Sequence, residues 1–218
     1  MMADFIRADK LEKKEKQAGK VEKAKTKKRL FLTVLLVIFF ALGFALAALI
    51  FYRPPIEFPL TLIQAENVEI IPVVDRNFFN VTLTEINSAS QQIDIAMFEF
   101  RFYENEENKV RLLAEALVNA AARGVKVRVL LDQSDWNPKI RKNNEPTINF
   151  LRENGVEAKF DSEKKTLHAK LLIIDDSVIV GSTNLGFHAL ERNSEAGVLI
   201  KSKEVADYYR TYFEQLWE

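Results

Sequence analysis

Short apolar runs alternate with amphipathic segments from residue 68 to the end of the chain. Apolar runs bounded by turn residues predict strands, and apolar positions that recur every three or four residues predict helices. The predicted strands are residues 68–73, 93–98, 125–131, 156–160, 171–174, 178–180 and 195–200, and the predicted helices are residues 78–89, 110–122, 146–153 and 203–217. This alternation indicates the α/β class, with a mixed parallel and antiparallel sheet and helices on both faces.

One apolar stretch differs from the others because it carries no charge over 23 residues, from Leu30 to Tyr52. About 20 apolar residues suffice to cross a bilayer, so residues 30–52 predict one N-terminal transmembrane helix. A buried core helix fits less well, because core helices are seldom apolar on every side. A cleaved signal peptide has a shorter apolar region of about 7 to 15 residues, although Ala45-Leu46-Ala47 offers a small-residue cleavage pattern.

The charge distribution orients the predicted helix. The chain has 31 basic and 31 acidic residues, but residues 1–29 hold 11 Lys/Arg against five Asp/Glu, which leaves a net charge of −6 on the remainder. Basic flanks stay in the cytoplasm, and residues 53–67 contain one basic residue, Arg53. We therefore expect a basic cytoplasmic tail (1–29), the membrane helix (30–52), a linker (53–67) and an extracytoplasmic domain (68–218). The tail is interpreted as a solvated segment that sets topology, with anionic lipid or nucleic-acid binding as the alternative.

Polar side chains gather at the open ends of the hairpin predicted at residues 171–180. His168 and Lys170 stand at the start of its first strand, and Ser182 and Asn184 follow its second strand. Antiparallel pairing places the two open ends side by side. An imidazole, an ammonium group, a hydroxyl and an amide would then converge on a space where one phosphate group fits.

The pattern His168-x-Lys170-x4-Asp175, followed by Gly181-Ser182-x-Asn184 and Asn193-x-Glu195, resembles the HxKx4D…GSxN signature of the phospholipase D superfamily. The resemblance extends upstream to about Val68 and covers about two thirds of the chain. It implies a phospholipase D-like α/β fold, a phosphodiester substrate and a covalent two-step reaction that needs no metal and no cofactor. The absence of His, Cys and carboxylate clusters with metal-ligand spacing agrees with this expectation.

The resemblance also implies a role for each motif residue. His168 would attack phosphorus and form a phosphohistidine, and Glu195 would hold its other ring nitrogen. Lys170, Asn184 and Ser182 would bind the phosphate oxygens. Asp175 belongs to the signature, but its place in the hairpin turn suits a structural role as well as a catalytic one.

Only one copy of the signature is present, whereas the reaction needs a second histidine to protonate the leaving group. The one other histidine, His188, lies in a predicted loop outside any family motif and is interpreted as a surface or packing residue. We therefore expect a homodimer in which His168 of both subunits faces one shared site. With one copy of the signature, the chain resembles the small members of the family, namely a homodimeric bacterial nuclease and a membrane-anchored mitochondrial enzyme.

Three more side chains are candidates for substrate binding. Trp136 lies in the predicted loop 133–144, where it could stack on an anionic substrate, although an ordinary solvated loop explains it equally well. Lys164 and Lys165 add positive charge just before His168.

The sequence leaves three functions open. A membrane-anchored phosphodiesterase acting on nucleic acid, of the endonuclease type, is slightly favoured, although a net charge of −6 outside the tail gives no general attraction to polyanions. A phospholipase D or phosphatidyltransferase acting on membrane lipids is the alternative, since the short linker would hold the site near the bilayer. A non-catalytic membrane-tethered dimer is the third, and the intact motif argues against it.

Overall fold

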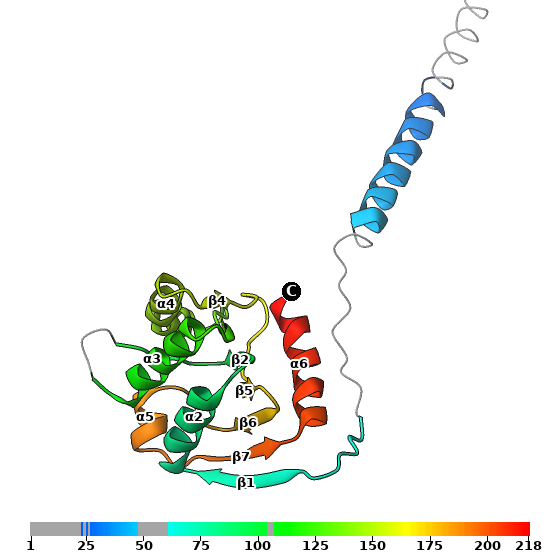
Figure 1. The fold of residues 1–218 in the computed structure, drawn as a ribbon. Helices are drawn as coiled ribbons and strands as arrows, with labels where there is room; N and C mark the ends of the chain where they lie inside the picture. The colour runs from blue at the N-terminus through cyan, green and yellow to red at the C-terminus, as the bar shows by residue number, and fades with distance from the viewer. Residues whose placement is uncertain (1–22, 24, 26, 48–60, 104–106) are drawn as a thin grey trace, which may run out of the picture. The chain divides into compact units, whose positions relative to one another are not determined.

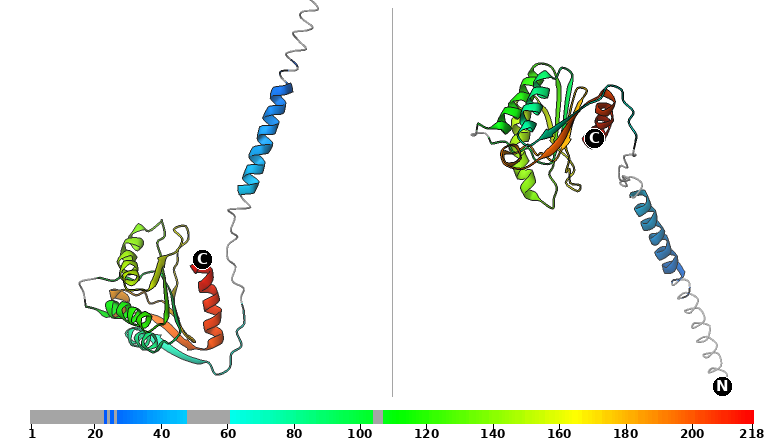
Figure 2. Two further views of the ribbon diagram at one scale, coloured as in Figure 1. Left: turned by 45° about the horizontal axis from the view of Figure 1, so that its top comes forward. Right: turned by 90° about the horizontal axis from the view of Figure 1, so that it is seen from below.

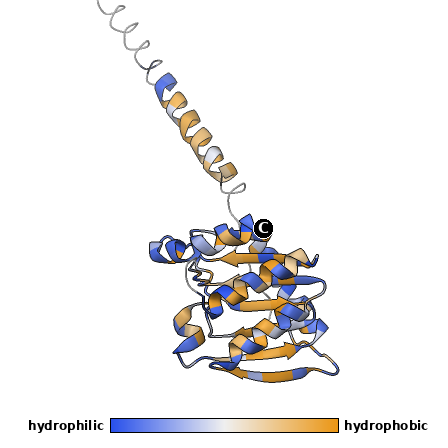
Figure 3. Ribbon diagram, turned by 60° about the vertical axis from the view of Figure 1, so that its left-hand side comes forward, coloured by the Kyte–Doolittle hydropathy of each residue, from blue (hydrophilic) through white to orange (hydrophobic). Residues whose placement is uncertain are grey.

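The computed structural model describes residues 23, 25, 27–47, 61–103 and 107–218, and the chain divides into two compact units, Met1–Glu57 and Phe58–Glu218. The first unit contains the helix Lys27–Ala47, whose most apolar 18 residues have a mean hydropathy of 2.8 and include no buried residue. Figure 3 shows apolar residues along almost all of this helix. Its 21 residues span about 31 Å at 1.5 Å per residue, close to the hydrocarbon thickness of a bilayer. Residues 48–52 of the predicted membrane segment lie outside the described residues.

The second unit is built on a seven-stranded mixed sheet (Figure 1). The strand order is β1-β7-β6-β5-β2-β3-β4. Strands β2, β3 and β4 are parallel, and the other neighbours are antiparallel. The strands are β1 (Glu69–Val74), β2 (Gln92–Met97), β3 (Lys126–Leu131), β4 (Glu157–Phe160), β5 (Lys170–Ile174), β6 (Ser177–Gly181) and β7 (Ala196–Lys201). The α/β class and the mixed sheet predicted from the sequence are confirmed.

Helices cover both faces of the sheet, as predicted. Figures 1 and 2 show α6 on one face and α2, α3 and α4 on the other. The helices are α2 (Asn77–Ser88), α3 (Lys109–Ala122), α4 (Pro138–Glu153), α5 (Phe187–Glu191) and α6 (Lys203–Trp217). Each face has its own apolar core, a large one that includes Leu113, Leu117 and Ile148, and a smaller one around Phe213 of α6. Burial of these side chains is the main force that stabilises the domain.

Two sequence-based assignments are wrong. The predicted loop 133–144 ends at Asn137, because α4 begins at Pro138 and runs through Pro146 rather than starting there. Proline is favoured in the first turn, and the burial of Ile140, Asn144 and Ile148 on one side shows why the helix continues across Pro146. His188 lies in the short helix α5 and not in a loop.

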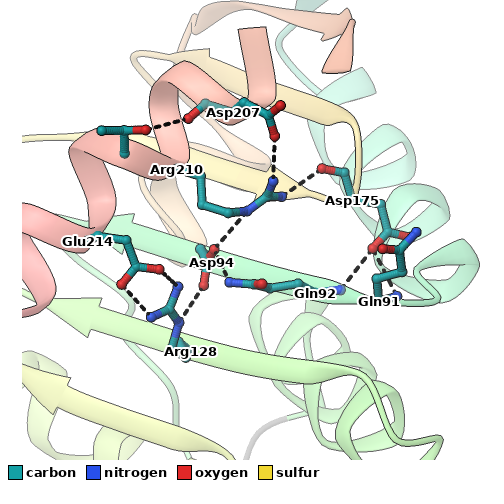
Figure 4. A network of polar contacts seen from close by, with 9 residues as sticks. Gln91, Gln92, Asp94, Arg128, Asp175, Asp207, Arg210 and Glu214 are labelled. Carbon is teal, nitrogen blue, oxygen red and sulfur yellow. Dashed lines mark hydrogen bonds and ion pairs between the residues drawn. The ribbon is translucent and has the colours of Figure 1, made fainter. Parts of the chain in front are cut away.

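A buried charge network attaches α6 to the sheet (Figure 4). Arg128 of β3 donates from Nε to Asp94 of β2 at 2.7 Å, and its two terminal nitrogens bind the Glu214 carboxylate of α6 at 2.9 and 2.6 Å. Arg210 of α6 approaches Asp94 at 3.4 Å and donates to the backbone carbonyl of Asp175 at 2.7 Å. The network therefore fixes α6 against both the central strands and the β5–β6 turn.

Candidate active site

The β5–β6 hairpin brings the motif residues to one edge of the sheet. Leu171 pairs with Val180, so Lys170 and Gly181 lie at the open end, and β7 adds Gly197 opposite Gly181. Antiparallel pairing of three strands therefore collects the start of β5, the end of β6 and the start of β7. The hairpin predicted from the sequence therefore brings Lys170 and Ser182 to the same edge of the sheet.

Glycine is required where β6 and β7 approach each other. A Cβ at Gly181 would lie 2.6 Å from the backbone oxygen of Ala196 and 2.6 Å from the Cα of Gly197. A side chain at this position would therefore push the two strands apart. The close approach lets Ser182 N–H bond to the Ala196 carbonyl at 3.0 Å, so the glycine of the GSxN motif sets the position of its serine.

His168 is exposed and lies in the segment that leads into β5. Its ring packs against Phe98 with 4.7 Å between ring centroids. Lys170 Nζ lies 5.0 Å from the centre of the same Phe98 ring and donates to the backbone carbonyl of His168 at 2.9 Å. Phe98 thus supports both the imidazole and the ammonium group.

Lys170 is buried, with 9% of its surface exposed. Burial lowers the pKa of Lys170 below its ordinary value, and the charges of Glu195, Asp132 and Glu99 partly offset this effect by favouring the ammonium form. Three carboxylates from separate segments therefore act on this cation through their charge. A desolvated cation can stabilise negative charge on a phosphate more strongly than one in water.

Glu195 forms a compact set of contacts with the other motif residues. Its carboxylate accepts hydrogen bonds from the Ser182 hydroxyl and from the Asn193 amide, the latter at 3.0 Å. Ser182 Oγ in turn accepts from the backbone N–H of Ala196 at 3.1 Å. The predicted contact between Glu195 and His168 is not formed in the described part of the chain. Glu195 instead holds Ser182 and Asn193 in place.

A second set of contacts, which the sequence analysis missed, positions the His168 segment. Asp132, just after β3, accepts from the backbone N–H of Leu167 at 2.7 Å and from the Ser134 hydroxyl at 2.5 Å. Asn144 of α4 is fully buried and donates to the backbone carbonyls of Asp132 and Phe98 at 2.9 Å. These bonds tie the ends of β2 and β3 to the residue next to His168. A polar residue at the end of a buried parallel strand was the one available signal for Asp132.

Asp175 lies at the opposite end of β5 from the site, separated from Lys170 by the length of the strand. Its carboxylate accepts from the backbone N–H groups of Ser90, Gln91 and Gln92 at 2.8, 3.0 and 2.9 Å. Burial alone would raise the pKa of Asp175, but these bonds outweigh it and lower the pKa. Asp175 also has a left-handed backbone with φ of 46°, as the turn requires. The carboxylate therefore fastens the hairpin turn to the segment before β2.

The remaining candidates lie on the loops next to His168. Trp136 is 65% exposed and donates from its indole nitrogen to the Thr166 hydroxyl at 2.6 Å. Lys164 and Lys165 are exposed in the neighbouring loop. Burial, followed by the charge of Asp132, raises the pKa of Asp161 in this loop to about 7. These side chains form a rim and do not contact the Glu195 and Ser182 set directly among the described residues.

Asn184 belongs to a separate feature, a cavity of about 330 Å3 that it lines together with residues of α5 and the segment after β2. Its Oδ1 atom is buried and has no hydrogen-bond partner within the described residues. The described residues also contain no group of three or more His, Cys, Asp or Glu side chains that could hold a metal ion. The site can therefore supply a nucleophile, a buried cation and neutral donors.

Comparison with known proteins identifies relatives of this arrangement. The family described as "Cardiolipin synthase, PLD-like domain" matches residues 82–217, which include every motif residue. A phospholipase D from Rickettsia conorii is 39% identical over 99 residues, which are 45% of this chain and 47% of that protein. The chain thus aligns with about half the length of the curated relatives it matches.

Solved structures share the fold. Nuc from Salmonella typhimurium, a phospholipase D family member, superimposes with a TM-score of 0.60 at 22% identity, over 69% of this chain and 95% of Nuc. NucT from Helicobacter pylori gives a TM-score of 0.55 at 22% identity, over 69% of this chain and 96% of NucT. The predicted fold family is thereby confirmed.

Proposed function

We propose, because this chain belongs to the phospholipase D superfamily, that it is a membrane-anchored phosphodiesterase that acts through a phosphohistidine at His168. The observation that carries the proposal is that the exposed His168 imidazole and the Lys170 ammonium group pack on the same Phe98 ring, while Glu195, which binds Ser182, acts on Lys170 through its charge. An exposed nucleophile next to a desolvated cation is the arrangement that attack on an anionic phosphodiester requires.

The reaction proceeds in two steps. One imidazole nitrogen of His168 attacks phosphorus, the bond from phosphorus to the leaving oxygen breaks, and a second histidine donates a proton to that oxygen. Water then attacks the phosphohistidine, loses its proton to the second histidine, and releases the product phosphate together with free His168. Neither step requires a metal ion.

Lys170 and Asn184 stabilise the five-coordinate transition state. The Lys170 ammonium group, whose burial at 9% exposure limits screening by water, offsets charge on the non-bridging oxygens. The Asn184 amide supplies a neutral hydrogen bond by donating from its Nδ2 group to a non-bridging oxygen. Glu195 acts mainly through Ser182 and Asn193, which it holds by hydrogen bonds.

The second histidine comes from another subunit of a homodimer. His168 is exposed on the site edge of the sheet, so a two-fold axis can bring two copies together over one phosphate. Mixing wild-type and His168→Asn subunits at equal amounts tests this arrangement. Random pairing leaves about a quarter of the wild-type activity if both histidines are needed in one dimer, and about half if each chain works alone. An activity near half contradicts the shared site.

The apolar helix Lys27–Ala47 anchors the enzyme, with the basic tail in the cytoplasm and the catalytic domain outside it. The helix is long enough to cross a bilayer and is apolar around its whole circumference. Protease added to intact cells should digest the catalytic domain and leave the tail protected. Protection of the domain in cells with a permeable surface layer contradicts this topology.

Nucleic acid is the favoured substrate class, and a membrane phospholipid is the second candidate. Exposed Trp136 and the adjacent Lys164 and Lys165 form a rim suited to a flexible polyanion. The lipid alternative rests on the membrane anchor, which would hold the site near headgroups. Purified protein in detergent micelles, incubated with single-stranded DNA, RNA or phosphatidylcholine in the presence of a chelator, separates the two. Hydrolysis of phosphatidylcholine without cleavage of either nucleic acid contradicts the favoured substrate.

A further inference from the structure

Most of the residues that line the cavity beside Asn184 do not belong to the catalytic motif. Arg101 and Tyr103 reach it from the segment after β2, and Phe187 and His188 reach it from α5. Asn184 and Asn193 line it from the side of the catalytic motif. The cavity therefore lies next to the proposed phosphate position and extends away from it.

The wall combines cationic and aromatic side chains. The Arg101 guanidinium lies 5.0 Å from the centre of the Tyr103 ring, and the His188 ring packs edge-on against Phe187 at 5.6 Å. One carboxylate, Glu99, also lines the cavity. Its Oε1 atom accepts from Asn143 at 2.7 Å, and its charge acts on Lys170. Among the described residues that line the cavity, Arg101 is therefore the one permanent cation and Glu99 is the one carboxylate.

We propose that this cavity is a subsite for the phosphate next to the scissile one in a nucleic-acid strand, with Arg101 as its principal ligand. The inference rests on the proposed function at His168 and specifies its substrate class. An arginine guanidinium binds a phosphate through paired hydrogen bonds and keeps its charge at any physiological pH. The Arg192 guanidinium lies 5.4 Å from the centre of the Phe187 ring, and Phe187 is 38% exposed, so its remaining open surface can contact the base of the intervening nucleotide.

The size and chemistry of the cavity favour a nucleotide over a lipid. Its volume of about 330 Å3 is at the small end of ligand sites, enough for one nucleotide-sized group. A diacyl lipid would need an extended apolar wall, whereas Arg101, His188 and Asn193 are polar. A second phosphate at a fixed distance from the first is a property of a polynucleotide and not of phosphatidylcholine.

Asn184 links the cavity to the catalytic motif. Its buried Oδ1 atom accepts no hydrogen bond within the described residues, so an N–H group of the base of a bound nucleotide would supply the missing donor. Because Asn184 also serves the scissile phosphate, occupation of the cavity and reaction at His168 become coupled. A substrate with a phosphate in the cavity should therefore react faster than one without it.

Dinucleotides with one hydrolysable phosphodiester test the subsite. The full-length protein in detergent micelles is given the thymidine dinucleotide alone, with a 5′-terminal phosphate, or with a 3′-terminal phosphate, and kcat/KM is measured for each. One terminal phosphate should raise kcat/KM about 10-fold or more, as expected for a charge-assisted contact. Arg101→Ala should reduce this ratio to about 1, and Arg101→Lys should retain part of it. The matched control is Lys126→Ala, an exposed cation at the far end of β3, which should leave the ratio unchanged.

Three outcomes overturn the inference. A wild-type ratio near 1 for both terminal phosphates shows that no flanking phosphate is bound. A ratio that survives in Arg101→Ala places that phosphate elsewhere. Hydrolysis of phosphatidylcholine vesicles without hydrolysis of any dinucleotide refutes the proposed nucleic-acid function as well, and so distinguishes that failure from the other two.

Discussion

Removal of the Asp132 carboxylate should reduce the activity of His168, although Asp132 does not contact the His168 side chain. Asp132 is fully buried and accepts a 2.7 Å hydrogen bond from the backbone N–H of Leu167, the residue before His168. In Asp132→Ala this N–H loses its partner, as does the Ser134 hydroxyl. The His168 segment would then be free to shift relative to Lys170 and Glu195.

The size of the effect follows from these contacts. The Asp132 carboxylate accepts three hydrogen bonds, two short ones from Leu167 N–H and the Ser134 hydroxyl and a longer one from Ser134 N–H at 3.3 Å. A hydrogen bond to a charged group contributes about 1.5–3 kcal/mol, so loss of the two short bonds alone should destabilise the fold by about 3–5 kcal/mol. A displacement of the nucleophile by about 1 Å can reduce the rate about 100-fold. We expect kcat to fall about 10- to 100-fold with little change in KM, because the substrate contacts themselves remain.

The matched variant is Asp132→Asn, which keeps an oxygen that can accept from Leu167 N–H. It should retain most of the wild-type kcat. The assay is steady-state hydrolysis of bis(p-nitrophenyl) phosphate by full-length protein in detergent micelles, at a temperature where circular dichroism shows each variant to be folded. A folded Asp132→Ala variant with wild-type kcat refutes the positioning role. Equal losses in Asp132→Ala and Asp132→Asn refute it too, because they point to the charge and not to the hydrogen bond.

Three further predictions concern stability, measured by chemical denaturation of the compact unit Phe58–Glu218. Arg128→Met should lower the free energy of unfolding by about 3–5 kcal/mol, because the fully buried Asp94 loses its closest cation. Arg128→Met combined with Asp94→Leu should lower it less than Arg128→Met alone, and equal losses would contradict the pairing. Asp161 has a pKa of about 7 in the fold, above the ordinary value of 3.8, so the native state binds the proton more tightly and stability falls as pH rises between these values. Asp161→Asn should remove this loss, so its stability relative to wild type should rise by about 1–2 kcal/mol between pH 5 and pH 8, after allowance for solvent screening. A stability difference that does not change with pH would exclude the effect. Asp175 has a lowered pKa, so its stabilisation is present above the ordinary value of 3.8 and is lost as pH falls through its lower folded-state pKa. Asp175→Asn should therefore be less stable than wild type at pH 7, and this difference should shrink as pH falls below 3.8. Its activity per folded molecule should persist, because the carboxylate is structural.

Most of the strands could be predicted from the sequence because their apolar runs are buried. The predicted strand 171–174, for example, is buried throughout and differs from β5 by one residue. The start of helix α4 is harder to predict from the sequence, since Asn144 and Thr147 occupy buried positions that apolar residues usually fill. Their burial is possible because Asn144 and Thr147 bond to backbone groups of the segment after β2. Those partners lie more than 40 residues away in the sequence, so no local pattern reveals them.

The same reason limits what the sequence reveals of the site. The spacing of His168, Lys170 and Ser182 predicts that they converge, because a hairpin brings its own two ends together. The contact between Asp132 and Leu167 spans 35 residues and depends on the order of the strands in the sheet. The cavity at Arg101 and His188 likewise joins segments that are distant in the sequence. Sequence patterns therefore identify the chemical groups of the site but not the residues that position them.

The most direct test of the account is to trap the phosphohistidine. Full-length protein with a chelator is mixed with bis(p-nitrophenyl) phosphate, quenched in alkali within the first turnovers, digested and analysed by mass spectrometry. The account predicts a nitrophenyl phosphate adduct on the peptide that contains His168, and neither adduct nor turnover in His168→Asn, whose fold stays intact because the side chain is exposed. An adduct on another residue, or turnover by His168→Asn, would contradict the covalent role of His168.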